Sequence, residues 1–299
     1  MIYVRVPATS ANLGPGFDCL GLALNLYNKI SVAYTDSFYI KLAGSYPNQI
    51  PADENNLVWK TMCYLWKQAG FSIPKVSLIL ENNIPPARGL GSSSAAIVGG
   101  LLLANTLAGS PFSKDELLQM AYELEGHPDN VTPALFGGIT LSIPTNKGII
   151  PRVLVDSPEF RALAIVPDFL LKTNKARMVL SSEVTRQDAV FNISHVALLV
   201  DAFLRKDYKL LKEAMQDRLH QTQRASLIPG MSEALESALE AGAYGAALSG
   251  SGPTLLALIP PEAEDLVSAA MVKIFESHGL SAQAFSLEID PHGAQVIID

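Results

Sequence analysis

Residues 85–95 read Pro-Pro-Ala-Arg-Gly-Leu-Gly-Ser-Ser-Ser-Ala, between a run typical of a strand at 76–80 and a helix of small residues expected over 92–107. Glycines allow a backbone to turn its N–H groups inward, and the uncapped first turn of the helix adds donors and the positive end of a dipole. The three serines add hydroxyl donors or a metal ligand. The stretch therefore predicts a cradle for an anion, and a triphosphate fits it.

Three better-known loops do not fit these residues. A Walker A loop needs Gly-Lys-Ser/Thr, whereas Gly91 is followed by Ser92 and the loop contains no lysine. A dinucleotide fingerprint needs a βαβ unit, but the helix at 92–107 is followed by another helix. The Gly-x-Ser-x-Gly elbow of hydrolases is absent. The alternative to an anion site is a structural turn that leads into a tightly packed helix.

Hydrophobic periodicity, capping residues and glycines outline the elements around this loop. In the N-terminal part we expect strands at 2–6, 24–33 and 76–80, a glycine-containing loop at 8–16, and helices at 55–69, at 92–107 and from the capping box Ser113/Glu116 to about Gly126. Further on we expect strands at 137–143, 152–155, 163–166, 246–249, 254–259 and 282–289, and helices at 185–217, 231–241 and 262–277. This mixed order predicts an α+β protein with two domains, 1–165 and 166–299.

Charge and composition exclude several classes of protein. The 299 residues carry 22 Lys and Arg against 29 Asp and Glu, a net charge of −7 without a basic run, which argues against a nucleic-acid partner. Cys19 and Cys63 form neither a disulfide framework nor a Cys-x-x-Cys metal site, as is typical of a reducing compartment. No signal peptide and no stretch of the ~18 apolar residues of a membrane span is present. We expect a soluble, cytoplasmic protein without a membrane partner.

Three segments together resemble the GHMP kinases, the superfamily that includes galactokinase, homoserine kinase and mevalonate kinase. They are residues 86–96, residues 7–18 (Pro-Ala-Thr-Ser-Ala-Asn-Leu-Gly-Pro-Gly-Phe-Asp) and residues 248–254 (Leu-Ser-Gly-Ser-Gly-Pro-Thr). The sibling kinases typically begin with a Pro-Gly-Lys or Pro-Gly-Arg motif, whereas residues 7–18, 125–131 and 224–230 are similar to the homoserine kinase family. The resemblance implies an N-terminal domain like ribosomal protein S5 domain 2, a ferredoxin-like C-terminal domain, and a homodimer.

The resemblance implies ATP-dependent phosphorylation of the side-chain hydroxyl of L-homoserine, which yields O-phospho-L-homoserine for threonine biosynthesis. A zwitterionic amino acid needs a carboxylate for its ammonium group and a guanidinium for its carboxylate, because desolvated charges without partners cost several kcal/mol. Asp18, Arg177 and Arg224 lie at the matching positions, and Asn12 and His127 add hydrogen bonds. Without the resemblance, Asp18 is explained equally well as a residue that caps a backbone turn. Both arginines would then be expected on solvent-exposed helix faces.

The nucleotide and metal assignments also come from the resemblance. The expected nucleotide-binding residues are Pro86, Ala87, Arg88, Gly89, Leu90, Gly91, Ser92, Ser93, Ser94, Ala95 and Ala96, with Asn56 at the adenine. Asn56 is explained equally well as a helix cap. Phosphoryl transfer needs Mg²⁺, which requires few protein ligands. By the resemblance, Ser93 and Glu123 are the expected ligands, with Glu125 as the alternative because the segment before His127 varies in length across the family. Two glutamates two residues apart on a helix cannot face the same way, so only one of them should reach the metal.

The expected catalytic residues are Asn130, Asn12 and Arg177. Sibling kinases place an aspartate near the attacking hydroxyl, but Asn130 occupies that position in the His-Pro-Asp-Asn segment, and an amide cannot accept a proton at neutral pH. We therefore expect Asn130 to orient the hydroxyl, whose proton leaves late to a phosphate oxygen or to solvent. The alternative is a base at Asp129.

Two other functions compete with this interpretation. One is a GHMP kinase for another small alcohol, such as a mevalonate-like acid, which has no ammonium group for Asp18 to bind. The other is a catalytically silent nucleotide-binding module on the same fold. The presence of Ser93, Glu123 and Asn130 argues against it.

Overall fold

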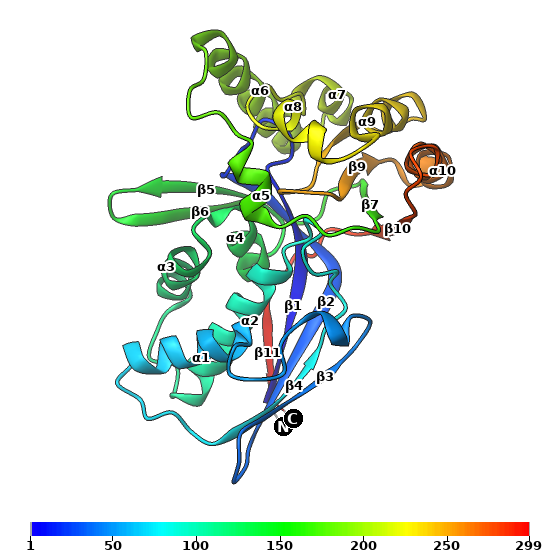
Figure 1. Ribbon diagram of the computed structural model, residues 1–299. Helices are drawn as coiled ribbons and strands as arrows, with labels where there is room; N and C mark the ends of the chain where they lie inside the picture. The colour runs from blue at the N-terminus through cyan, green and yellow to red at the C-terminus, as the bar shows by residue number, and fades with distance from the viewer. Residues whose placement is uncertain (1, 299) are drawn as a thin grey trace.

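A computed structural model describes residues 2–298, and within them the strands form one seven-stranded and one four-stranded sheet (Figure 1). The first sheet has the order β11-β1-β2-β4-β3, with β5 paired to β2 and β6 to β5. Its strands are β1 (Ile2–Ala11), β2 (Leu20–Tyr34), β3 (Tyr39–Ala43), β4 (Val76–Glu81), β5 (Ile139–Thr145), β6 (Gly148–Val155) and β11 (Gln295–Ile298). All pairs are antiparallel except β3 with β4.

Four helices belong to this part of the molecule, and local side-chain caps explain where two of them begin. They are α1 (Leu57–Gln68), α2 (Ser92–Leu107), α3 (Lys114–Glu125) and α4 (Pro128–Phe136). Asn56 caps α1 through its side chain, and Ser113 and Glu116 form the expected capping box of α3. The helices expected at 55–69, at 92–107 and after Ser113 are confirmed.

The second sheet has the order β10-β7-β9-β8 and is antiparallel throughout. Its strands are β7 (Arg161–Pro167), β8 (Gly245–Leu248), β9 (Leu255–Ile259) and β10 (Ala282–Leu287). The helices of this part are α5 (Thr173–Met178), α6 (Arg186–Arg205), α7 (Leu211–Ala214), α8 (Gln221–Arg224), α9 (Met231–Glu240) and α10 (Glu264–Ser277). Antiparallel sheets with helices packed against them confirm the α+β class. No helix within residues 2–298 has the length and hydropathy that crossing a membrane requires.

Alternating side chains of β7 join the two parts of the molecule. Ala162, Ala164 and Val166 belong to the large apolar core that includes α1, α2 and α6, whereas Leu163 and Ile165 belong to a second core under α9 and α10. The second sheet is therefore buried on both faces, and one of its faces shares a core with the first sheet. The cleft described below lies where the two parts meet.

Several elements differ from the sequence-based expectation, and proline accounts for two of the differences. β1 continues past Pro7 to Ala11, with a register shift against β2 at Pro7/Ala8, so the loop expected at 8–16 begins later. Pro128 occupies the first turn of the unexpected helix α4, where its missing N–H costs nothing. The helix expected over 185–217 ends at Arg205, where Lys206 adopts a left-handed conformation.

The chain crosses between the two sheets more than once. β7 lies wholly in the second sheet, so the expected boundary at residue 165 falls inside a strand. β11 was not expected, and it returns the chain to the first sheet, where it pairs with β1. The division into two domains at residue 165 stays a proposal.

Small residues allow α2 to pack closely on both sides, which explains the composition of this helix. A Cβ added at Gly99 would run into the side chains of Ile30 and Val6 on the sheet. A Cβ added at Gly100 would lie 2.9 Å from the carbonyl oxygen of Val58 on α1. The close approach on both sides holds the N-terminal end of α2, and with it the preceding loop, in place.

Gly100→Ala should destabilise the protein although alanine is the better helix former. The propensity gain of ~1 kcal/mol is outweighed by overpacking against the α1 backbone, which costs about 1–3 kcal/mol. The measurement is urea unfolding, where we expect a lower midpoint with an unchanged slope. Thr106→Ala on the same helix is the control, because the Thr106 hydroxyl only bonds back to the Leu102 carbonyl. A higher midpoint for Gly100→Ala would contradict this packing.

Candidate active site

The loop between β4 and α2 turns through left-handed backbone conformations. Gly89 and Gly91 have φ of 80° and 67°. A side chain at Gly89 would run into the carbonyl of Ser249, and one at Gly91 into the hydroxyl of Thr9. Glycine is therefore required at both positions, by conformation and by space.

Hydrogen bonds from distant segments hold four consecutive carbonyls of this loop. The donors are Leu171 N to the Ala87 carbonyl (3.1 Å), Thr254 N to that of Arg88 (3.3 Å), Ser249 Oγ to that of Gly89 (2.6 Å) and Thr9 N to that of Leu90 (3.2 Å). In a trans peptide the C=O points opposite to the next residue's N–H, so the N–H groups of residues 88–91 face away from these partners. Those of residues 89–91 find no acceptor within residues 2–298. The loop thus leaves backbone donors without an internal partner among the described residues, as an anion cradle requires.

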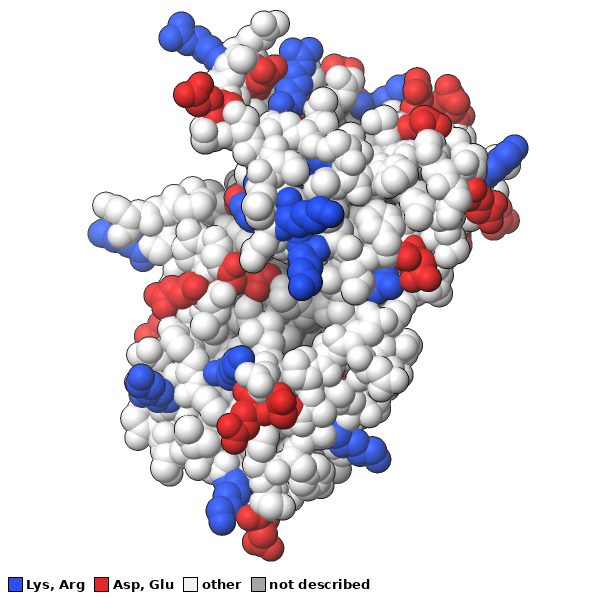
Figure 2. All heavy atoms as spheres, in the orientation of Figure 1, with Lys and Arg blue, Asp and Glu red and all other residues white. Residues whose placement is uncertain are grey.

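A cavity of about 430 Å³ opens in front of this loop, between the two parts of the molecule. Figure 2 shows this face hollowed near its middle, with blue side chains gathered over α5 at its edge. The expected site residues that line the cavity are Asn12, Asp18, Asn56, Pro86, Ala87, Gly89, Gly91, Ser92, Ser93, Ser94, Ala96, His127, Asn130, Arg177 and Arg224. Glu125 lines it too. The structure therefore brings most of the expected residues into one cavity.

Four expected residues do not line this cavity: Arg88, Leu90, Ala95 and Glu123. The guanidinium of Arg88 bonds to the carboxylate of Asp168 (3.0 Å) and to the side chain of Gln49 (3.2 Å), so it is directed away from the phosphate cradle. Leu90 and Ala95 have buried side chains in the apolar core. Any contribution of these three loop residues to nucleotide binding would therefore come from their backbone.

Asp18 and Arg177 form a two-pronged ion pair at the cavity. Arg177 Nη2 and Nη1 lie 2.7 and 3.1 Å from the two carboxylate oxygens of Asp18. This hydrogen bond is the main reason why the pKa of Arg177 is raised above its ordinary value. Both side chains are only about one-third exposed. The pair places an anion and a cation at one wall of the site.

Arg224 is a buried cation without a carboxylate partner among the described residues. It is 2% exposed, and its Nε and Nη1 donate to the backbone carbonyls of Ala176 (3.1 Å) and Gly250 (3.0 Å). Burial, together with the neighbouring charge of Arg177, lowers the pKa of Arg224 to about 10. The guanidinium thus stays charged at neutral pH and is held by neutral acceptors. A buried charge of this kind calls for an anionic ligand.

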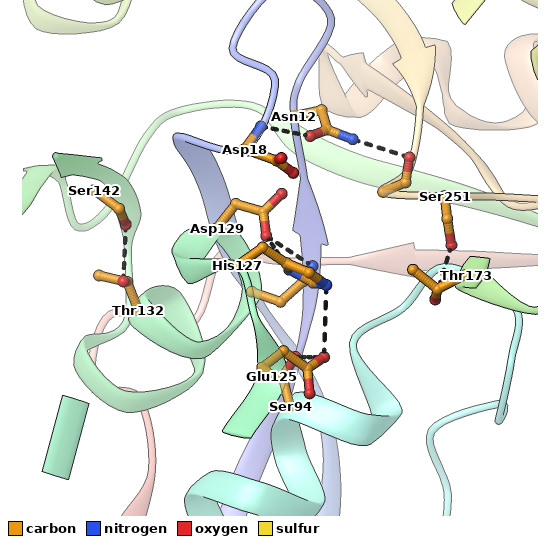
Figure 3. Close-up of polar contacts among 12 residues, drawn as sticks. Asn12, Asp18, Ser94, Glu125, His127, Asp129, Thr132, Ser142, Thr173 and Ser251 are labelled. Carbon is orange, nitrogen blue, oxygen red and sulfur yellow. Dashed lines mark hydrogen bonds and ion pairs between the residues drawn. The ribbon is translucent and has the colours of Figure 1, made fainter. Parts of the chain in front are cut away.

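His127, Asp129 and Asn130 form a connected network at the start of α4, of which Figure 3 shows His127 and Asp129. His127 Nδ1 lies 2.7 Å from Asp129 Oδ1, and Asn130 Nδ2 lies 3.3 Å from the same oxygen. Thr9 donates its hydroxyl to Asn130 Oδ1 (2.8 Å). Burial alone would lower the pKa of His127, but the hydrogen bond and charge of Asp129, with the charge of Glu125, raise it above its usual value. Asp129 therefore already has a cationic or hydrogen-bonding partner.

The two glutamates at the end of α3 face different ways. Glu125 Oε1 accepts hydrogen bonds from the hydroxyls of Ser93 (2.6 Å) and Ser94 (2.9 Å) in the first turn of α2. Figure 3 shows the bond between Ser94 and Glu125. Glu123 instead accepts a bond from the Tyr64 hydroxyl (2.8 Å), outside the cavity. The structure thus places Ser93 beside Glu125, the alternative ligand, and not beside Glu123, because the helix phase turns Glu125 toward the serines.

The segment at 248–254 closes the site from the second sheet. Ser249 donates to the Gly89 carbonyl, and the carbonyl of Gly250 accepts from both Asn12 Nδ2 (2.9 Å) and Arg224. Asn12 Oδ1 in turn accepts from the backbone N–H of Asp18 (3.1 Å). Asn12 thus uses both ends of its amide to hold the loop that carries Asp18.

Asn56 both lines the cavity and caps α1. Its Oδ1 accepts from Val58 N (2.9 Å), and its Nδ2 donates to the Pro51 carbonyl (2.6 Å). Both ends of the amide are therefore engaged with backbone, as a cap requires.

Sequence reasoning missed two side chains that support the site. Thr9 orients Asn130, and His220 lies 3.2 Å from Arg224 Nη1. Thr9 stands within the segment 7–18, and His220 stands four residues before Arg224, which is one helical turn away. The sequence shows both positions, but a threonine or a histidine does not by itself indicate a functional site.

Comparison with known proteins agrees with this geometry. Residues 56–138 match the model of the GHMP kinases N terminal domain, and residues 199–277 match that of the GHMP kinases C terminal domain. The homoserine kinase of Desulfitobacterium hafniense is 59% identical to this chain, and the match covers 99% of this chain and 100% of that protein. The homoserine kinase of Caldanaerobacter subterraneus is 47% identical, and the match covers 99% of this chain and 96% of that protein. The crystal structure of homoserine kinase from Cytophaga hutchinsonii superimposes with a TM-score of 0.89 at 31% identity, covering 99% of this chain and 97% of that one. The chain therefore belongs to the homoserine kinase family of the GHMP kinases and has their two-domain fold.

Proposed function

We propose that the protein transfers the γ-phosphoryl group of ATP to the side-chain hydroxyl of L-homoserine. The observation that carries the proposal is Arg224, a buried cation without an acidic partner within residues 2–298, in the same cavity as Asp18 and the phosphate cradle. An α-amino acid supplies the carboxylate that Arg224 needs and an ammonium group for Asp18. The names of the relatives support this assignment.

Binding of the zwitterionic substrate would replace the ion pair between Asp18 and Arg177 with several ion pairs between the protein and the substrate. Asp18 and Arg177 neutralise each other in the structure. In the proposed complex, Asp18 binds the ammonium group while Arg177 and Arg224 share the carboxylate, and His127 adds a hydrogen bond. Each charge of the substrate then has an opposite charge in a partly desolvated site, which limits the cost of removing it from water.

The polyphosphate of ATP would lie along residues 86–96. The free N–H groups of residues 89–91, the first turn of α2 and the hydroxyl of Ser92 present donors to it, whereas the hydroxyls of Ser93 and Ser94 donate to Glu125. Because the side chain of Arg88 is engaged with Asp168, backbone dipoles rather than a loop cation supply the attraction. We keep Asn56 as a residue near the base.

The donor set at the first turn of α2 fits Mg²⁺. The hydroxyl of Ser93 and the carboxylate of Glu125 are hard oxygen ligands that lie 2.6 Å apart, and the latter replaces Glu123 in our assignment. Among the described residues no group of three or more His, Cys, Asp or Glu side chains is arranged to hold a metal ion by itself, so phosphate oxygens would have to complete the coordination. When bound there, the ion would neutralise charge on the phosphates.

Asn130 is suited to orienting the hydroxyl rather than to removing its proton. Its Oδ1 is fixed by Thr9, and an amide accepts no proton at neutral pH. Asp129 is bonded to His127 and to Asn130, so its role here is to hold these two side chains. The proton would leave late, to a phosphate oxygen or to solvent, and Asn12 and Arg177 would keep the substrate in line.

Asp18→Asn should lower kcat/KM for L-homoserine by roughly 100-fold, because the ammonium group loses its charged partner. The measurement is ADP release with L-homoserine and, in parallel, with γ-hydroxybutyrate, which has the carboxylate but no ammonium group. Turnover of γ-hydroxybutyrate should change little. An equal loss for both substrates would contradict the assigned role of Asp18.

Asn130→Ala should lower kcat by roughly 100-fold while KM for ATP stays near its original value, because only the position of the attacking hydroxyl is lost. Steady-state kinetics over a range of pH make the test. An almost unchanged kcat, or a bell-shaped profile that disappears in Asp129→Asn, would instead point to a base at Asp129.

Glu125→Gln should raise the Mg²⁺ concentration needed for half-maximal activity by roughly 10-fold or more, since one anionic ligand is lost. Glu123→Gln is the matched control, two residues away on the same helix, and should leave this concentration unchanged. Mg²⁺ titrations of both variants decide the matter. A large effect in the Glu123 variant alone would restore the original assignment.

A further inference from the structure

The imidazole of His220 is fully buried behind the cavity, next to Arg224. Its Nε2 lies 2.8 Å from the Gly14 carbonyl, and its Nδ1 lies 3.2 Å from Arg224 Nη1. The ring also stacks on Phe17, with centroids 5.1 Å apart. None of the roles assigned above uses this side chain.

The partners of His220 determine its tautomer. A carbonyl oxygen can only accept, so the nitrogen that faces Gly14 must carry a hydrogen. The guanidinium of Arg224 can only donate, so Nδ1 must present its lone pair. His220 is therefore neutral with its hydrogen on Nε2, and burial also lowers the pKa of this group.

An arginine that binds a carboxylate ligand needs uncharged hydrogen-bond acceptors around it, and the neutral Nδ1 of His220 is such an acceptor for Arg224. The other acceptors around Arg224 are the carbonyls of Ala176 and Gly250, also uncharged. Nη2, the remaining nitrogen, makes no hydrogen bond within residues 2–298, and Arg224 lines the cavity. An acidic side chain in place of His220 would orient the guanidinium equally well but would neutralise the charge that attracts the ligand.

The same imidazole connects the two charges that recognise the substrate. Gly14 lies in the loop that carries Asp18, and Arg224 lies on α8 in the other half of the chain. The backbone N–H of His220 donates to Asp217 Oδ2 (2.9 Å), so the position of the ring is fixed from behind as well.

We infer that His220 is a positioning residue for substrate recognition: its neutral Nδ1 holds the Arg224 guanidinium toward the cavity, and its Nε2–H fixes that tautomer on the Gly14 carbonyl. The inference rests on the proposed function in one respect, namely that Arg224 binds the substrate carboxylate. It assigns to His220 a role in the KM for the amino acid and none in the binding of ATP.

Two variants separate the contacts of the ring. His220→Asn keeps an acceptor near the position of Nδ1 and loses the donor to Gly14. His220→Gln keeps a donor near the position of Nε2 and loses the acceptor for Arg224. For His220→Gln we expect KM for L-homoserine to rise roughly 10-fold or more, as for one lost hydrogen bond to a charged group, with KM for ATP unchanged. His220→Asn should recover most of this loss.

Controls distinguish positioning from general destabilisation. His278→Gln, at a histidine that contacts Glu233 on the far helices, should leave both KM values unchanged. With aminopropanol, which is homoserine without its carboxylate, His220→Gln should differ little from the wild type. Equal increases of both KM values in the two His220 variants, together with a lower unfolding midpoint, would mean that the residue is only structural and would overturn the inference.

The wild-type protein allows a test that needs no folded variant. Long-range proton–nitrogen correlation spectra at neutral pH should show His220 neutral with its hydrogen on Nε2; an imidazolium, or a hydrogen on Nδ1, would overturn the inference. If the wild-type protein does not phosphorylate L-homoserine at all, the proposed function fails, and this spectrum still tests the hydrogen bonding of His220 on its own.

Discussion

The structure of the site depends on four backbone carbonyls, those of residues 87–90, being held by hydrogen bonds from three other parts of the chain. Because successive peptide groups are planar and trans, fixing these carbonyls also fixes the direction of the following N–H groups. The N–H groups of residues 89–91 have no acceptor among the described residues, and the contacts to the carbonyls keep them in this arrangement. An anion that reaches the loop finds its donors already oriented.

The three segments that hold these carbonyls also carry the residues proposed to bind the acceptor. The donor Thr9 belongs to the segment that continues to Asp18, Ser249 is followed by the Gly250 carbonyl that binds Arg224, and Leu171 directly precedes α5, which bears Arg177. The contacts that shape the phosphate cradle are thus the same contacts that place the amino-acid pocket beside it. Proximity of the two substrates, which phosphoryl transfer requires, is built into the fold.

Much of the fold was predictable from the sequence wherever residues close together in the chain determine the structure. The caps Asn56 and Ser113 and the glycine-serine loop indicated the correct helices, because these signals act within a few residues. The effect of a proline was not predictable, since the sequence does not show that Pro7 lies at a register shift or that Pro128 begins a helix. β11 was missed because its partner lies at the other end of the chain.

The errors in the site have the same origin. The choice between Glu123 and Glu125 depends on the rotation of α3 relative to α2, which is a tertiary property. Arg88 stands in the cradle by sequence but bonds to Asp168 across the molecule. The most direct test of the account is a crystal structure with L-homoserine and a non-hydrolysable ATP analogue. The account predicts the triphosphate on the N–H groups of residues 89–91 and the amino acid between Asp18 and Arg224, whereas phosphates bound elsewhere, or a homoserine carboxylate remote from Arg224, would contradict it.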